Sequence, residues 1–154
     1  MRVMALDVGG RRIGVAISDE LRIIASPLTT IPAEPRPAAL EQIVRLVEQH
    51  EVSQVVVGLP LTMRGEVGPQ AQQITAFARA LGKRLSVPIV FFDERFSSAE
   101  AERRMLEAGL RRERRKQRID EIAAVVILQD YLESLRGGMP TLLPPDEPED
   151  EPED

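Results

Sequence analysis

Three carboxylates carry the clearest chemical signal in this sequence. Asp7 ends an apolar stretch over 2–8, Glu94 lies at the end of another that begins at 88, and Asp120 opens a nearly all-apolar stretch. Strand ends and a helix start on one side of a sheet can meet at a single crevice. Clustered carboxylates repel each other unless a hard cation such as Mg²⁺ or Mn²⁺ neutralises them. We therefore predict Asp7, Glu94 and Asp120 as catalytic residues and as metal ligands.

Such a cluster suits phosphoryl chemistry. Two ions about 4 Å apart would activate a water and stabilise the leaving oxygen of a phosphodiester. Each carboxylate also has a simpler interpretation, because Asp7 precedes two glycines of a turn, Asp120 can be a helix N-cap, and Glu94 can pair with Arg95. None is specific alone, and their joint placement favours a metal-dependent site.

A basic stretch precedes Asp120. Residues 103–118 hold eight bases against two acids, which predicts either a solvated surface or a clamp on a phosphate backbone. We take the second alternative because of its position beside Asp120. The candidate substrate-binding side chains in it are Arg111, Arg112, Arg114, Arg115 and Lys116. Aromatic residues make up only 3% of the chain, so sequence-specific reading of single strands by aromatic stacking is not expected.

The net charge of −5 is unevenly spread. Residues 146–154 contain seven acids and no base, and the 18 acids and 20 bases of the remainder leave that part at +2. An acidic, proline-rich segment cannot bury a core, so we expect a folded domain over 1–138 and a disordered tail over 139–154. A negative total charge therefore does not exclude a nucleic-acid substrate.

Composition excludes several other classes of protein. With no cysteine and one histidine, zinc-ribbon, thiol-nucleophile and Ser-His-Asp sites have almost no candidate residues. Apolar runs are too short to span a membrane, and Asp7 comes too early for a signal peptide. We expect a cytoplasmic protein with no membrane partner.

The elements that must position these residues follow from hydrophobic periodicity. Three strands are expected first, and then strands alternate with helices, which predicts an α/β fold: a mixed five-stranded sheet, its first three strands antiparallel, with helices on both faces. A proline at position 27 suggests that the third strand lies at an edge. Strands are expected over 2–8, 13–18, 23–28, 54–59 and 88–92, and helices over 37–50, 69–85, 98–108 and 120–135.

Five sequence blocks, in this order, resemble the YqgF/RuvX family, small ribonuclease H-like proteins named for similarity to Holliday junction resolvases and assigned to maturation of the 5′ end of 16S rRNA. The resemblance covers residues 1–136. The blocks are Ala5-Leu6-Asp7-Val8-Gly9, Arg12-Ile13-Gly14-Val15-Ala16-Ile17-Ser18-Asp19, Val57-Gly58-Leu59-Pro60, Asp93-Glu94-Arg95-Phe96-Ser97-Ser98 and Asp120-Glu121-Ile122-Ala123-Ala124.

The resemblance implies a ribonuclease H-like fold in which Asp7, Glu94 and Asp120 bind the metal. It also implies that Arg95 and Ser97 flank the site and that Gly9 and Arg12 lie near the phosphate. The loop Thr62-Met63-Arg64-Gly65 departs from the Asn-x-Asp-Gly pattern common in the family, so no substrate contact is assigned to it.

The favoured function is a metal-dependent endonuclease for structured RNA, with precursor 16S rRNA and ribosomal particles as partners of a monomer or homodimer. A Holliday junction resolvase acting on branched DNA is the related alternative, and it would need a dimer for two symmetric cuts. A non-catalytic RNA-binding assembly factor remains open. A nucleotide-hydrolysing actin-like protein is disfavoured, because that architecture needs two such domains.

Overall fold

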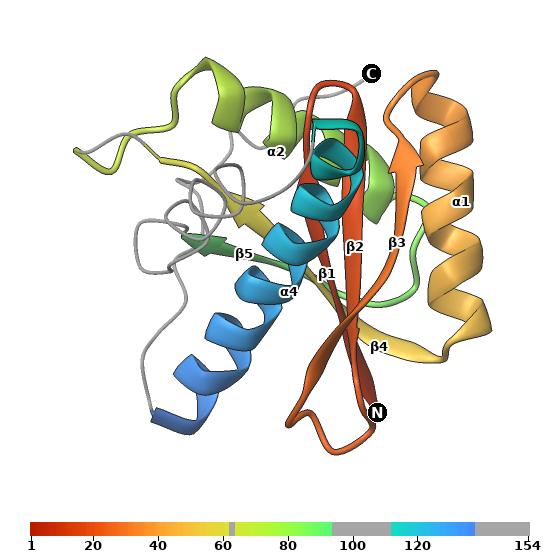
Figure 1. The fold of residues 1–154 in the computed structure, drawn as a ribbon, viewed down its shortest axis with the longest axis vertical. Coiled ribbons are helices and arrows are strands. Elements are labelled where there is room, and N and C mark those ends of the chain that lie inside the picture. The colour runs from red at the N-terminus through yellow and green to blue at the C-terminus, as the bar shows by residue number, and fades with distance from the viewer. Residues whose placement is uncertain (62–63, 94–111, 138–154) are drawn as a thin grey trace.

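A five-stranded mixed sheet forms the centre of the molecule in a computed structural model that describes residues 1–61, 64–93 and 112–137 (Figure 1). The strand order is β3-β2-β1-β4-β5, with β1–β2 and β2–β3 antiparallel and β1–β4 and β4–β5 parallel. The expected fold class is confirmed. The strands are β1 (Arg2–Val8), β2 (Arg12–Ser18), β3 (Ala25–Pro32), β4 (Val52–Leu59) and β5 (Ile89–Asp93).

The three parallel strands bring the site to one edge of the sheet. Because β1, β4 and β5 run in the same direction, their carboxyl ends, at Val8, Leu59 and Asp93, lie at the same edge. In open α/β sheets this is the edge at which ligands bind. Asp7 therefore occupies the position that the sequence predicted, at the end of a buried central strand.

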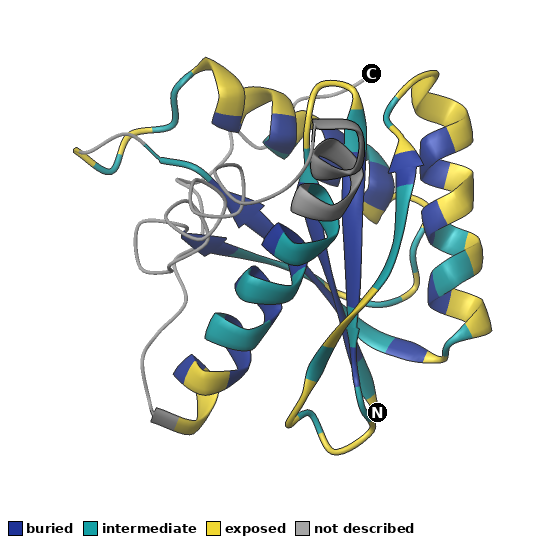
Figure 2. Cartoon of the chain, in the orientation of Figure 1, coloured by how far each residue is buried: buried dark blue, intermediate teal, exposed yellow. Residues whose placement is uncertain are grey.

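Two helices cover one face of the sheet, α1 (Arg36–Gln49) and α2 (Pro69–Gly82) (Figure 1). Both begin with a proline in the first turn, where the missing N–H costs nothing. Figure 2 shows buried positions on one side of α1 and exposed positions on the other, as an amphipathic helix requires. Their apolar stripes pack against sheet residues such as Met4 and Leu6.

A long helix, α4 (Arg112–Gly137), crosses the other face (Figure 1). Alternation along β1 turns Val3 and Ala5 toward this face, where they pack with Ile127 and Leu128 of the helix. The Tyr131 hydroxyl donates a hydrogen bond to Gln54 Oε1 at 3.1 Å, and burial raises the pKa of Tyr131. Helices therefore lie on both faces, as expected.

The start of α4 corrects one prediction. The helix begins at Arg112, so Asp120 lies inside it and is neither its first residue nor its N-cap. Residues 112–118, expected to precede the helix, form its first two turns because Arg, Lys, Gln and Glu are all good helix formers. The expected helix over 98–108, the loop residues 62–63 and the tail over 139–154 lie outside the described residues.

The third strand lies at the sheet edge, as Pro27 indicated, but it spans Ala25–Pro32 and not 23–28. The β2–β3 register shifts between Val15 and Ala16, immediately beside the Pro27 pairing, which is where a ladder tolerates a missing N–H. The strand is tied to α4 through the Thr30 hydroxyl, which donates to Glu121 Oε2 at 3.1 Å.

Small residues on β1 and β2 let α4 approach the sheet closely. Gly14 faces the helix, and an ideal Cβ built there would overlap the backbone carbonyl of Asp120 and lie 3.1 Å from the Glu121 nitrogen. A glycine inside a strand often marks such a close approach of two backbones. Gly14 thus determines how near the helix lies to the sheet.

Replacing Gly14 with alanine is expected to destabilise the fold by about 1–3 kcal/mol, because the added methyl group must displace the Asp120 backbone. Urea unfolding measures this loss. Gly82→Ala is the matched control, since its Cβ would meet only Ile89 Cδ1 at an ordinary 3.6 Å. Equal stability of the two variants would contradict the close approach.

Candidate functional site

Asp7 is a buried carboxylate on the α4 face of the sheet. Val3 and Ala5 of the same strand pack under α4, and alternation places Asp7 on their side. Asp7 follows the buried apolar residues of β1 and is itself only 8% exposed. A buried carboxylate persists only with polar or cationic partners, which is the situation expected of a ligand-binding acid.

Asp120 reaches the same place from α4. Asp7 pairs across the antiparallel ladder with Gly14, and Gly14 is the residue against which the Asp120 backbone rests. Directly opposite residues in such a ladder lie about 5 Å apart. Strand register and helix packing therefore bring two of the three predicted acids to one region of one sheet face.

A protein cation already contacts one of these acids. Arg12 Nε lies 3.0 Å from Asp120 Oδ2, and the two side chains are 32% and 22% exposed. Arg12 was predicted to lie near the substrate phosphate, and it is held beside the candidate metal ligand by this ion pair. Its position at the start of β2 explains the contact, because Gly14 and the helix lie two residues further along the same strand.

Gly9 shapes the turn between β1 and β2. Its N–H donates to the Arg12 carbonyl at 2.9 Å, and a Cβ on Gly9 would lie only 2.8 Å from that oxygen. The geometry of the turn therefore already requires a glycine at position 9, the residue predicted to lie near the phosphate. This turn places Arg12 directly beyond the end of β1.

The remaining predicted residues are not placed. Glu94, Arg95, Ser97 and Arg111 lie outside the described residues. The other four basic candidates belong to the first turns of α4, ahead of Asp120, but their side chains lie outside the description: Arg112, Arg114, Arg115 and Lys116.

Oxygen donors of this kind suit a hard divalent cation. Asp7 and Asp120 offer carboxylate oxygens on one sheet face, and Asp120 already attracts a positive group. Within residues 1–61, 64–93 and the described side chains of α4, no three acidic, histidine or cysteine residues form a metal-binding group. Two of the predicted ligands fit Mg²⁺ or Mn²⁺, and the third lies outside this part of the chain.

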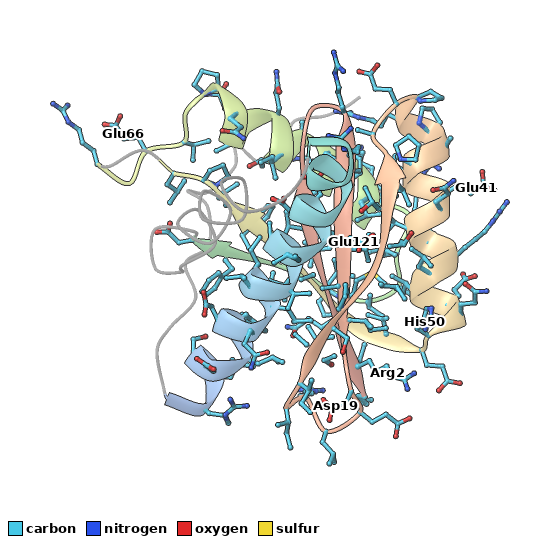
Figure 3. All side chains as sticks on the ribbon, in the orientation of Figure 1. Arg2, Asp19, Glu41, His50, Glu66 and Glu121 are labelled. Carbon is cyan, nitrogen blue, oxygen red and sulfur yellow. The ribbon has the colours of Figure 1, made fainter. Side chains whose placement is uncertain are left out.

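Two contributors to the site were not identified from the sequence. Gly14 carried a detectable signal, a glycine inside a strand, which often marks a close backbone approach. Glu121 carried none, because its acceptor role toward Thr30 depends on how β3 and α4 meet. Figure 3 labels Glu121 at the centre of this packed region. Both residues fix α4 on the sheet and thereby fix Asp120.

Solved structures share this architecture. Holliday-junction-bound RuvC from T. thermophilus superimposes with a TM-score of 0.62 at 14% identity, over 92% of this chain and 99% of that one. The fowlpox virus Holliday junction resolvase gives a TM-score of 0.51 at 13% identity, over 87% of this chain and 99% of the other. The likeness is one of fold, and the class of fold is the mixed five-stranded sheet with helices on both faces.

Sequence relatives define the family within that class. The family model described as "RuvX: Holliday junction resolvase" matches residues 1–134, so the chain belongs to the RuvX family. A Roseiflexus sp. relative is 53% identical over 88% of this chain and 96% of its own length. A Chloroflexus aurantiacus relative is 56% identical over 87% of this chain and 88% of its own; both are named "Putative pre-16S rRNA nuclease". The expected family and enzyme class, a nuclease, are confirmed.

None of the helices in the described parts of the chain combines the length and hydropathy that a membrane span requires.

Replacing Arg12 with methionine is expected to tighten Mn²⁺ binding, because it removes the cation that competes for Asp120. A partly exposed pair contributes up to about 1 kcal/mol, so the gain is at most about fivefold in Kd. Isothermal titration with Mn²⁺ measures it, and Arg11→Met in the neighbouring turn is the control. Weaker binding by the Arg12 variant would show that Arg12 supports the cation site and does not compete with it.

Proposed function

We propose that this chain is a metal-dependent endonuclease that hydrolyses phosphodiester bonds in structured RNA and matures the 5′ end of precursor 16S rRNA. One observation carries the proposal. Asp7, buried at the end of β1, and Asp120, inside α4, converge on one sheet face through the Gly14 contact. Their convergence is costly without a cation, and the Arg12 ion pair is consistent with a local demand for positive charge.

In this proposal Asp7, Asp120 and Glu94 hold Mg²⁺ or Mn²⁺. The bound metal supplies Lewis acidity that lowers the pKa of water and offsets charge on the phosphodiester oxygens. Glu94 follows directly after β5, whose carboxyl end lies at the same sheet edge as that of β1. That adjacency supports its inclusion.

The remaining residues act on the substrate. With a divalent ion on Asp120, the Arg12 guanidinium becomes available to bind a phosphate in bidentate fashion. Gly9 would lie near the phosphate, and Arg95 and Ser97 would flank the acids. The basic segment that leads into and opens α4 would then track the phosphate backbone through Arg111, Arg112, Arg114, Arg115 and Lys116.

RNA is proposed as the substrate because the relatives that cover nearly the whole folded domain carry a pre-rRNA nuclease name. Precursor ribosomal particles are then the partners, the cytoplasm is the compartment, and a monomer suffices for a single cut. The second candidate is a Holliday junction resolvase, which the description of the family model and the likeness to RuvC favour. Two symmetric cuts in branched DNA would require a homodimer.

Asp7→Asn, Glu94→Gln and Asp120→Asn are each expected to lower cleavage at least about a hundredfold, because metal stabilisation of the transition state is worth several kcal/mol. The assay uses a precursor 16S rRNA fragment and a four-way DNA junction, each with Mn²⁺ and with EDTA. Glu41→Gln, which removes an exposed acid of α1, is the control for lost negative charge.

Cleavage of the rRNA fragment alone supports the proposal, and cleavage of the junction alone supports the resolvase. Full activity of Asp7→Asn on RNA would contradict the assigned site. Normal rRNA maturation in cells that carry Asp7→Asn would instead indicate a non-catalytic assembly factor.

Deleting residues 146–154 is expected to strengthen RNA binding at low salt, because the deletion removes seven acids that repel phosphate. The gain should disappear at high salt, where these charges are screened. Fluorescence anisotropy with the rRNA fragment measures it, and a variant with all seven acids changed to amides controls for length. Unchanged affinity in both variants would remove any electrostatic role for this segment.

A further inference from the structure

A groove lies on the side of the sheet opposite to α4, next to the end of β1. Its volume is about 390 Å³, within the range of small-molecule sites. Buried Ile74 and Phe77 of α2 form part of its floor. The wall includes Val8 at the end of β1, Gly9 and Gly10 of the β1–β2 turn, and residues 33–36 at the start of α1. Figure 1 shows the β1–β2 turn and the start of α1 at the same end of the molecule.

The groove lies next to the candidate site, on the other side of the end of β1. Asp7 points to the α4 face, and the next residue, Val8, packs with the core on the α1–α2 face and lines the groove. A strand that crosses the end of β1 would therefore meet the acids on one side and the groove on the other. The two regions are separated by the end of a single strand.

The polar groups of the groove match a nucleotide. The Arg36 guanidinium lies 6.0 Å from the centre of the Phe77 ring, so the guanidinium is supported from below by an aromatic face. Gln70 and Gln73 add amides that both donate and accept. In the described part of the chain these two amides make no hydrogen bond, so both are available to a ligand.

The groove entrance is open and carries charges of both signs. An ideal Cβ on Gly10 meets nothing within 4 Å, so the backbone of the turn is accessible there. Among the described residues that line the groove, Glu34 is the one acid, and Arg36 lines the same space. Arg11 and Arg12 of the adjoining turn make the surroundings basic.

We propose that this groove binds an unpaired nucleotide of the substrate strand, adjacent to the phosphate at the acid site, with its base stacked on Arg36 and its edge read by Gln70 and Gln73. The inference rests on the proposed nuclease function. It gives that function a preference for a single-stranded flank beside the cut, because a base held in a duplex cannot enter a concave groove of this size. An arginine plane replaces the aromatic stacking platform that the composition lacks.

The test measures affinity without cleavage. A fluorescein-labelled single-stranded oligouridylate and a fully paired RNA duplex are titrated in EDTA against wild type, Arg36→Gln, the double variant Gln70→Ala/Gln73→Ala, and Gly10→Leu. Gly10→Leu fills the entrance without a backbone penalty, since the position is open and its φ is not in the left-handed region. The controls are Gln72→Ala and Arg45→Gln, exposed residues of the same two helices outside the groove.

Each groove variant is expected to weaken single-strand binding on the order of tenfold, which is what one stacked base contributes to affinity. Duplex binding by these variants, and both kinds of binding by the two control variants, should be unchanged. An equal loss of affinity for the single strand and the duplex would overturn the proposal that the groove binds a nucleotide. Unchanged single-strand affinity in Gly10→Leu would overturn it as well. Thermal melting of each variant separates these results from misfolding.

Because cleavage is measured separately with Asp7→Asn, an active nuclease whose groove variants bind normally refutes only this inference. An RNA-binding groove on a protein that cleaves nothing refutes only the nuclease.

Discussion

The contact between α4 and β2 at Gly14 is the constraint on which the rest of the site depends. The Asp120 backbone occupies the space that any side chain at Gly14 would need. Asp7 is the cross-strand neighbour of Gly14, so one packing contact sets both the depth of the helix and the spacing of the two acids. Further along α4, the Tyr131 hydroxyl donates a hydrogen bond to Gln54 of β4, which ties the helix to the sheet at a second point. The packing of α4 on the sheet and the placement of the two acids are therefore determined by the same contact.

Electrostatics and topology extend that constraint. Two acids on one sheet face raise the local negative potential, and Arg12, at the start of β2, offsets part of it at Asp120. The end of β1 then separates this charged region from an apolar-floored groove with amide and guanidinium groups. In our account the phosphate and its neighbouring nucleotide are bound on the two sides of one strand end. A short β1–β2 turn makes that possible because it adds little bulk between them.

Sequence reasoning succeeded where local pattern and tertiary structure agree. A buried run ending in Asp7 predicted the strand and its acid, and Pro27 predicted an edge strand. The start of α4 was missed because an acid before an apolar run looks like an N-cap, whereas the polar helix formers before it show no apolar stripe. The Arg12–Asp120 pair, 108 residues apart in sequence, could not be predicted, since only the close approach at Gly14 brings the two side chains together.

A crystal structure of the wild-type protein soaked in Mn²⁺ tests the central claim most directly, because anomalous scattering locates the ion independently of the protein. Our account predicts an anomalous peak that places the Mn²⁺ ion within coordination distance of both Asp7 and Asp120. It also predicts Glu94 as a further ligand and Arg12 displaced from Asp120. An ion bound elsewhere, or Asp7 and Asp120 carboxylates separated by more than about 10 Å, would contradict it, because ligands of one or two bridged ions cannot be so far apart.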